Sequence, residues 1–220
     1  MASMTREGEV FVLDLGEGEN RFNGESLDSL EACLDEVEAA APCALVTRAR
    51  GKVWSNGLDL EWIGAQGDQA IPFVVRVHEL LARVLEMGVP TVAALQGHTF
   101  AAGAMLALAH DQRVMRADRG FFCLPEVDIG IPFTPGMSGL IAAKLPARAA
   151  HEAMTTGRRY GGEEAAAAGI VDEAAAEEDV LARALARAAA LAGKDPATLR
   201  TIKQRLHAAA LASLRGPQGF

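Results

Sequence analysis

One carboxylate, Glu126, stands in a setting that suits acid–base chemistry. It follows Pro125 after an apolar stretch and precedes the apolar segment 129–132. Apolar neighbours withdraw water from a carboxylate, which penalises its charged form and moves its pKa toward the range useful for proton transfer. A lone glutamate is usually a solvated surface charge, so Glu126 supports a functional prediction only together with other features.

Two turns built from small residues could supply groups that stabilise negative charge. The first, 54–60 (WSNGLDL), leads from a predicted strand toward a helix, and the second, 97–104 (GHTFAAGA), follows a buried strand and opens a helix. Backbone N–H groups at a helix start have no acceptor within the helix and can point at an anion or a developing oxyanion. Tight packing alone would explain either turn equally well.

Other patterns resemble known sites but lack a required part. Gly16-x-Gly18 follows a strand, yet position 21 is Arg where a dinucleotide-binding turn has its third glycine. The segment 135–139 (PGMSG) is one residue short of a nucleophile elbow, and no strand leads into it. The five histidines show no metal-ligand spacing, so we expect no metal. We expect His78 and His207, which lie in helical patterns, at the surface or at an interface.

Composition limits the class of protein. The chain has 220 residues, of which 50% are hydrophobic and 23% charged, as is typical of one globular domain. A net charge of -8 without a basic cluster predicts no nucleic-acid partner. The absence of a long apolar run and of a signal peptide predicts no membrane association and a cytoplasmic location.

Smaller compositional signals agree with that location. The odd number of cysteines, three, predicts free thiols in a reducing compartment. The bias toward Arg over Lys suggests a GC-rich bacterial genome. The segment 218–220 (QGF) carries no peroxisomal address.

Hydrophobic periodicity predicts alternating strands and helices in the first half of the chain. Ser26 is the expected N-cap of the first helix. After the Gly/Pro-rich stretch 130–139 the pattern is mainly helical to Leu214. This alternation predicts a buried, crossover-connected sheet. Strands are expected at 9–15, 44–49, 91–95, 112–115 and 120–123, and helices at 71–87 and 101–110.

In this order, the two turns and the Pro125-Glu126 pair resemble the crotonase (enoyl-CoA hydratase/isomerase) superfamily. Residues 155–157 (TTG) and 168–172 (AGIVD) extend the resemblance over most of the chain. It implies an α/β fold, a crotonase-type spiral of ββα units with a helical C-terminal region. One domain would span 1–220, with the spiral core over about 1–140 and a helical trimerisation region over about 141–220. The expected assembly is a homotrimer or a dimer of trimers.

The resemblance also implies roles for individual residues. The substrate would be an acyl-CoA thioester, with no separate cofactor because CoA is part of the substrate. The backbone amides of Leu58 and Ala102 would form an oxyanion hole. Lys203 would either reach a CoA phosphate, of its own or a neighbouring subunit, or be a solvated helix lysine. Aromatic residues either line an acyl pocket or fill the core: Trp62, Phe73, Phe122 and Phe133. Further contacts with substrate or CoA are expected from Lys52, Val53, Ser55, Gly57, Gly103 and Pro125.

Position 105 indicates which reaction this branch performs. Hydratases of the superfamily usually use two glutamates, and the first of them falls at this position, which is Met105 here. Hydration requires two carboxylates to activate water and to protonate C2, whereas moving a double bond from C3–C4 to C2–C3 requires one base. An apolar Met105 would also exclude water from the intermediate. The pattern resembles the Δ3,Δ2-enoyl-CoA isomerases of fatty-acid β-oxidation, with Glu126 as base and acid.

Three other readings have different consequences. A dienoyl-CoA isomerase is disfavoured because its acidic partner would fall near Met105 or Thr134, and neither is acidic. A hydratase, or another enzyme acting on CoA esters, could recruit His98 or Asp59 in place of the missing glutamate. A non-catalytic acyl-CoA-binding protein would not need Glu126. The sequence sets no acyl chain length.

Overall fold

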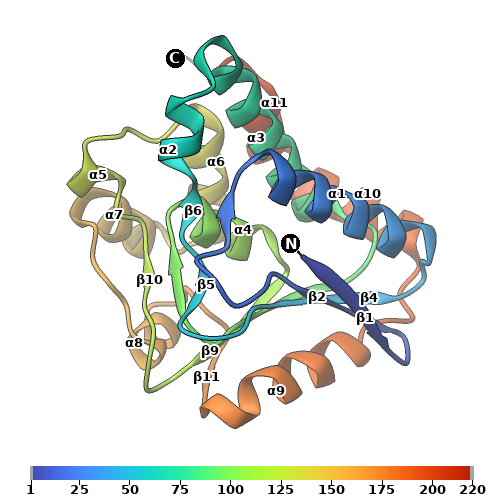
Figure 1. The fold of residues 1–220 in the computed structure, drawn as a ribbon. Helices are drawn as coiled ribbons and strands as arrows, with labels where there is room; N and C mark the ends of the chain where they lie inside the picture. Colours follow the sequence, from blue (N-terminus) through green and yellow to red (C-terminus); the bar gives the residue numbers. More distant parts are fainter. Residues whose placement is uncertain (1, 219–220) are drawn as a thin grey trace.

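The computed structural model describes residues 2–218 of the chain. Strands and helices alternate over its first half, and helices dominate its second half (Figure 1). The strands are β1 (Ser3–Glu7), β2 (Val10–Asp14), β3 (Arg21–Phe22), β4 (Ala44–Arg48), β5 (Val53–Ser55), β6 (Gly57–Leu58), β7 (Thr91–Leu95), β8 (His98–Phe100), β9 (Gln112–Arg116), β10 (Phe122–Cys123) and β11 (Glu173–Ala175). The helices are α1 (Gly24–Ala39), α2 (Leu60–Gly64), η1 (Gly67–Gln69, a 3₁₀ turn), α3 (Ala70–Glu86), α4 (Ala102–Ala109), α5 (Glu126–Ile129), α6 (Pro135–Lys144), α7 (Ala147–Thr156), α8 (Gly162–Ala167), α9 (Glu177–Ala189), α10 (Pro196–Leu206) and α11 (Ala208–Arg215).

The largest sheet contains six strands in the order β1-β2-β4-β7-β9-β11. Of its described strand pairs, β1–β2 alone is antiparallel, and the other neighbours are parallel. β2, β4 and β7 are almost entirely apolar and buried, as parallel strands must be when both faces of the sheet are covered. This arrangement confirms the predicted α/β class.

Helix α9 covers one face of this sheet with small side chains. Ala184 and Ala188 belong to one buried cluster with Val46 and Val92 of the central strands. Small residues let a helix lie close to a sheet without voids, which gives the Ala-rich composition a packing role. Larger residues fill the opposite face, where α1 and α3 lie (Figure 1).

Six short strands of the structure were not predicted from the sequence: β1, β3, β5, β6, β8 and β11. β1 is exposed and mostly polar, and it pairs with β2 through a turn at Gly8. β11 has the sequence EAA, which reads as helix, and it forms a strand because it adds to the edge at β9. The N-cap prediction for Ser26 was also wrong. Asn23 caps α1, and Ser26 occupies the third helical position, where the two residues exchange hydrogen bonds.

A three-stranded parallel sheet, in the order β10-β8-β5, brings the predicted chemical segments together. The carboxyl ends of parallel strands meet at one edge of their sheet. Residues 57–58 follow β5, residues 101–102 follow β8, and residues 125–126 follow β10. These three segments, which are far apart in the sequence, therefore lie together at one edge of the sheet.

The C-terminal helices close over that edge and share its core. α6 contacts both α4 and α11. A Cβ atom on Gly136 would lie 2.9 Å from the Cα atom of Leu214, so α6 and α11 touch backbone to backbone. Met137 and Leu211 belong to the same hydrophobic cluster as Leu45 of the main sheet. Among the described residues, no helix has the length and apolar character needed to span a membrane.

Candidate active site

A cavity of about 750 Å³ opens at the edge where β5, β8 and β10 end. Its size is typical of a site for a small molecule. The wall is mainly apolar and combines the turns after the strands with α2, α3, the α5–α6 segment and one residue after α11. The lining residues are Arg21, Val53, Asn56, Leu58, Leu60, Ile63, Val74, His98, Phe100, Ala101, Ala102, Pro125, Glu126, Ile129, Ile131, Pro132, Phe133, Thr134, Met137 and Gln218.

Leu58 and Ala102, the two residues predicted to donate backbone N–H groups, both line this cavity. A Cβ atom on Gly57 would lie 2.6 Å from the Ala102 nitrogen, so the two turns are in backbone contact. Gly57 also has φ of +77°, a conformation that residues with a Cβ atom rarely adopt. Ala102 begins α4, so its N–H group has no acceptor within the helix. The fold thus places both residues on one wall.

Ala101, the residue before α4, has a strained backbone that the sequence did not reveal. Its φ of 51° and ψ of -129° lie in a region that glycine tolerates and alanine does not. Such a conformation costs about 1–3 kcal/mol and persists where the surroundings enforce it. The Ala101 N–H group donates to the Cys123 carbonyl at 3.1 Å, which ties the turn to β10.

Glu126 occupies the first position of α5 and lines the cavity. Its side chain is buried, with 6% of the residue exposed, and its Oε2 atom finds no hydrogen-bond partner among the described residues. Burial raises the pKa of Glu126 to about 7, as its apolar neighbours predicted. The carboxyl group can therefore both accept and return a proton near neutral pH.

Among the described lining residues, Glu126 is the sole carboxylate. Met105 is fully buried in the core and is not part of the cavity wall. Asp59 is not on the wall either, because its side chain caps α2 and accepts the Trp62 N–H group at 3.1 Å. Of the two residues considered as replacements for a second glutamate, only His98 reaches the cavity.

The His98 ring packs against Phe100 and Phe121, at centroid distances of 5.2 and 5.6 Å. Its Nδ1 atom is buried and has no partner in the part of the chain that the structure describes. Burial, with Arg159 and Arg119 nearby, lowers the pKa of His98. The lowered pKa favours the neutral ring, in which one nitrogen is a donor and the other an acceptor.

Of the remaining residues predicted to contact the substrate or CoA, some line the cavity and others lie behind its wall. Val53 and Pro125 line the cavity, whereas Lys52 is exposed and does not. Ser55 and Gly103 lie behind the wall, where a Cβ atom on Gly103 would meet the Ser55 Oγ atom at 2.6 Å.

Ser55 holds the turn rather than facing the cavity. Its Oγ atom donates to the Asn20 carbonyl at 2.8 Å and accepts the Gly57 N–H group at 3.1 Å. Because Ser55 is fully buried, its side chain cannot contact a ligand in this structure. Ser55, Gly57 and Gly103 therefore shape the turns that carry Leu58 and Ala102.

Among the four aromatic residues considered for an acyl pocket, Phe133 alone lines the cavity. Trp62 and Phe73 pack edge to face at 4.7 Å. Phe122 is fully buried, and its backbone pairs with Tyr160. The other three aromatic side chains therefore fill or border the core.

The interpretation of Lys203 as a solvated helix lysine was wrong. The residue is 5% exposed, and its Nζ atom donates to Asp111 Oδ2 at 2.6 Å and to the Val89 carbonyl at 2.9 Å. It is therefore neither solvated nor placed in the cavity. His78 is also buried rather than at the surface, and its Nε2 atom shares a hydrogen bond with Thr134 Oγ1 at 3.0 Å.

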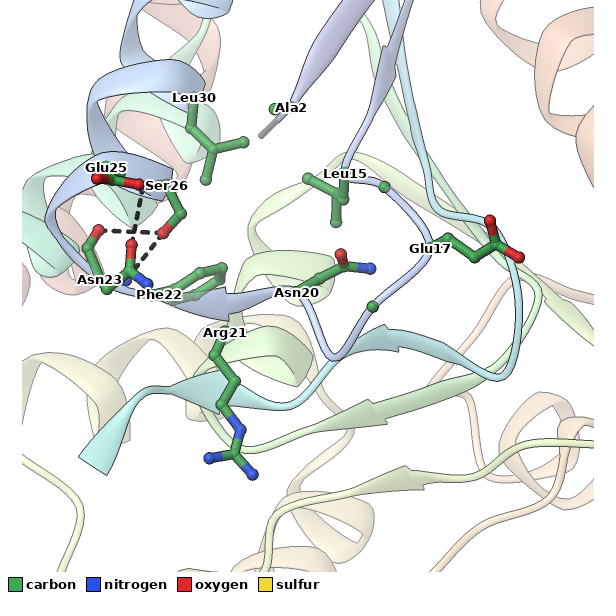
Figure 2. Close-up of a pocket in the computed structure, with 12 residues that line it drawn as sticks. Ala2, Leu15, Glu17, Asn20, Arg21, Phe22, Asn23, Glu25, Ser26 and Leu30 are labelled. Atoms are coloured by element: carbon green, nitrogen blue, oxygen red, sulfur yellow. Dashed lines mark hydrogen bonds between the residues drawn. The ribbon is translucent and has the colours of Figure 1, made fainter. Parts of the chain in front are cut away.

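A smaller cavity of about 310 Å³ lies at the start of α1 (Figure 2). Its lining includes the Gly16–Gly18 turn. Asn23 and Ser26 exchange hydrogen bonds of 3.0 and 2.8 Å there, so the end of α1 is already capped. Glu17 and Glu25 add negative charge that would repel a pyrophosphate. The rejection of a dinucleotide site therefore agrees with the structure.

The model of the enoyl-CoA hydratase/isomerase family matches residues 6–218. The chain belongs to the enoyl-CoA hydratase/isomerase family. This match confirms the resemblance to the crotonase superfamily and its fold. The protein is an enzyme of this family, whose members act on acyl-CoA substrates.

Several similar members of the enoyl-CoA hydratase/isomerase family are isomerases by name. Enoyl-CoA delta isomerase 3 of Arabidopsis thaliana is 39% identical over 186 residues, which cover 80% of this chain and 77% of that protein. The peroxisomal enoyl-CoA delta isomerase 2 of the same plant is 37% identical, covering 88% and 86%. Human mitochondrial Δ3,Δ2-enoyl-CoA isomerase superposes with a TM-score of 0.88 at 27% identity, covering 97% and 85%.

Proposed function

We propose that this enzyme is a Δ3,Δ2-enoyl-CoA isomerase. It moves the double bond of an acyl-CoA thioester from C3–C4 to C2–C3. The observation that carries the proposal is Glu126, the one carboxylate among the described cavity residues, buried and with a pKa raised to about 7. The isomerase names of the similar plant and human proteins support the same reaction.

In the proposed mechanism, Glu126 acts alone as base and then as acid. Its carboxylate removes a proton from C2, and the electrons move onto the thioester oxygen to form a dienolate. The protonated Glu126 then returns the proton to C4, and the double bond settles between C2 and C3. A pKa near 7 suits both steps because neither protonation state of the side chain is strongly disfavoured. No cofactor is required, since CoA is part of the substrate.

The backbone N–H groups of Leu58 and Ala102 hold the dienolate oxygen in this proposal. Support comes from their place on one wall and from the helix start at Ala102. Donors aimed at charge that develops during the reaction contribute about 10²–10³ in rate each. This donor is a backbone group, so the methyl side chain of Ala102 does not remove it.

An apolar wall protects the intermediate. Ile63, Val74 and Phe133 line the cavity, and Met105 fills the core where a hydratase would carry a glutamate. The carboxylate that would position a water molecule is therefore replaced by an apolar thioether side chain. A dienolate in such a site is protonated by Glu126 rather than by solvent.

Purified protein should convert 3-enoyl-CoA to 2-enoyl-CoA, and Glu126→Gln should lower kcat by about 10³-fold or more. The substitution replaces the titratable carboxylate by an amide that cannot accept the C2 proton, and it keeps the shape of the side chain. The matched control is Glu163→Gln, which changes an exposed glutamate of α8 and should leave kcat unchanged. Retained activity in Glu126→Gln would exclude this mechanism. Binding of acyl-CoA without any turnover would indicate the non-catalytic alternative.

A hydratase that uses His98 is the second candidate, because His98 lines the cavity with an unpartnered Nδ1 atom. An assay of 2-enoyl-CoA hydration separates the two reactions. Hydration removes the double bond that is conjugated with the thioester carbonyl, so its absorbance decreases. Strong hydration by the wild type that disappears in His98→Ala would replace the isomerase proposal. Isomerase activity that survives His98→Ala supports it.

The assembly and the location are part of the proposal. We expect a homotrimer or a dimer of trimers, and light scattering would measure the mass of the assembly. The CoA moiety is expected to lie along Lys52 and Val53. A bacterial source and the cytoplasm remain predictions from composition. Two of the similar plant proteins are named peroxisomal, so fractionation of the source cells is the direct test.

A further inference from the structure

Gln218 follows α11, and its side chain is fixed by backbone groups. Its Oε1 atom accepts the Gly136 N–H group at 3.1 Å. Its Nε2 atom donates to the carbonyls of Ser213, Leu214 and Gly216 at 2.8, 3.1 and 2.6 Å. The residue is 8% exposed, and it nevertheless lines the candidate active site. A glutamine held in this way is a fixed part of the wall, because its amide group cannot turn without losing these bonds.

The wall of the cavity has a sheet side and a helix side. Val53 and His98 begin β5 and β8 and are partly exposed. Met137 and Gln218 lie instead where α6 packs against α11, and both are buried. In Figure 1, α6 and α11 lie on the far side of α4 from β5 and β10.

This difference orients the substrate. The nucleotide part of CoA is too large and too polar for the buried helix side, so it must remain at the more open sheet side. The acyl chain then extends past Glu126 toward the helices. Most of the residues on its path are apolar, including Ile63, Val74, Phe133 and Met137, which suits an unsubstituted aliphatic chain.

We infer that Gln218 closes the acyl end of the cavity and sets the longest aliphatic chain that the enzyme accepts. The inference rests on the proposed isomerase function, because it requires an acyl-CoA in this cavity. The position and the hydrogen bonds of Gln218 suit a residue that ends the cavity. The residue lines the cavity while its amide group is hydrogen-bonded to backbone groups, so an acyl chain that reaches it meets neither a free polar group nor a movable one.

The experiment compares kcat/KM over a series of 3-enoyl-CoA substrates that lengthen by two carbons at a time. Gln218→Ala removes most of the stop and should move the best chain length upward by two to four carbons. Burying one more methylene is worth about fourfold, which corresponds to about 0.8 kcal/mol. The substrate two carbons longer than the wild-type optimum buries two more methylenes, so its kcat/KM in Gln218→Ala should exceed the wild-type value by about fifteenfold. Gln218→Asn keeps the amide but shortens the side chain, and it should give a smaller shift in the same direction.

Gln204→Ala is the matched control, because Gln204 is an exposed glutamine of α10 that bonds to Glu86 outside the cavity. It should leave the chain-length profile unchanged. Dissociation constants of saturated acyl-CoA analogues, measured by calorimetry, give a second profile that does not depend on turnover.

These arms separate the two claims. A wild type that turns over no 3-enoyl-CoA of any length overturns the proposed function. An active wild type whose turnover and binding profiles both stay the same in Gln218→Ala overturns the role of Gln218 and leaves the proposed function intact. A parallel upward shift of both profiles supports the inference.

Discussion

The backbone nitrogen of Ala102 lies 2.6 Å from the point that a Cβ atom on Gly57 would occupy. Gly57→Ala must therefore push α4 away from the turn and must also force alanine into φ of +77°. We expect kcat/KM to fall by about 10²-fold or more, because one donor to the dienolate oxygen is displaced. Gly18→Ala, at a glycine with open space around it, should have no such effect. Steady-state kinetics of both variants test the contact.

The raised pKa of Glu126 predicts a pH dependence of activity. The base must be ionised in the free enzyme, and burial raises its pKa to about 7. We expect kcat/KM to rise about tenfold per pH unit in the acidic range and to level off above about pH 8. Measurements from pH 5.5 to 8.5 give the profile. A flat profile, or one that falls over this range, would contradict the role of Glu126 as base.

Glu126 should also destabilise the folded protein at neutral and alkaline pH. Its pKa is raised from 4.5 to about 7, so the folded state holds this proton more tightly than the unfolded state does. The resulting stability is present below about pH 4.5 and is lost as the pH rises through 7.

Glu126→Gln should accordingly increase the free energy of unfolding by about 2–3 kcal/mol at pH 8, with a smaller gain at pH 5. Urea unfolding at both pH values measures the difference. An equal gain at the two pH values would show that burial of the charge is not its cause.

Ala101 offers a test of strain at the same turn. Glycine adopts φ near 51° without the cost that alanine pays, so Ala101→Gly should stabilise the protein by about 1 kcal/mol. Ala104→Gly, within α4, should have the opposite sign by a similar amount because glycine weakens helix interiors. Thermal unfolding of the two variants distinguishes local strain from a general effect of glycine.

The buried position of Lys203 predicts a structural rather than a ligand-binding role. Lys203→Met removes the partner of Asp111 and should cost about 2–3 kcal/mol of stability, less than the roughly 3–5 kcal/mol of a fully buried ion pair because the Asp111 side chain is 27% exposed. KM for the CoA substrate should not change. Lys194→Met alters an exposed lysine nearby in the sequence and should have little effect on stability. A raised KM with unchanged stability in Lys203→Met would support the CoA-phosphate interpretation instead.

Local patterns predicted most of the fold because they depend on neighbouring residues. The periodicity of α3 and the apolar run of β7 located both elements to within a residue. β1 was missed because an exposed edge strand needs no apolar face. β11 was missed because its three residues are strand only through their pairing with β9.

The chemistry of the site was predictable where one residue type carried it. The apolar neighbours of Glu126 predicted its raised pKa, and the resemblance to the crotonase superfamily singled out Leu58 and Ala102, which both line the cavity. The contacts of Lys203 and Gln218 were not predictable in the same way. Lys203 bonds to Asp111, which is far away in the sequence, and Gln218 bonds to a backbone N–H group, which residues of almost any type supply. Long-range contacts of this kind have no local signature.

The contact between Gly57 and the start of α4 also determines how this protein could acquire new specificity. The turns that carry Leu58 and Ala102 are in direct main-chain contact. Substitutions at this contact would displace the backbone N–H groups instead of adjusting the shape of the cavity. The opposite wall consists of side chains from helices, such as Ile63, Val74 and Met137, which can be replaced individually. A mutant library confined to these helical positions should therefore yield enzymes that accept other substrates and still catalyse the same reaction.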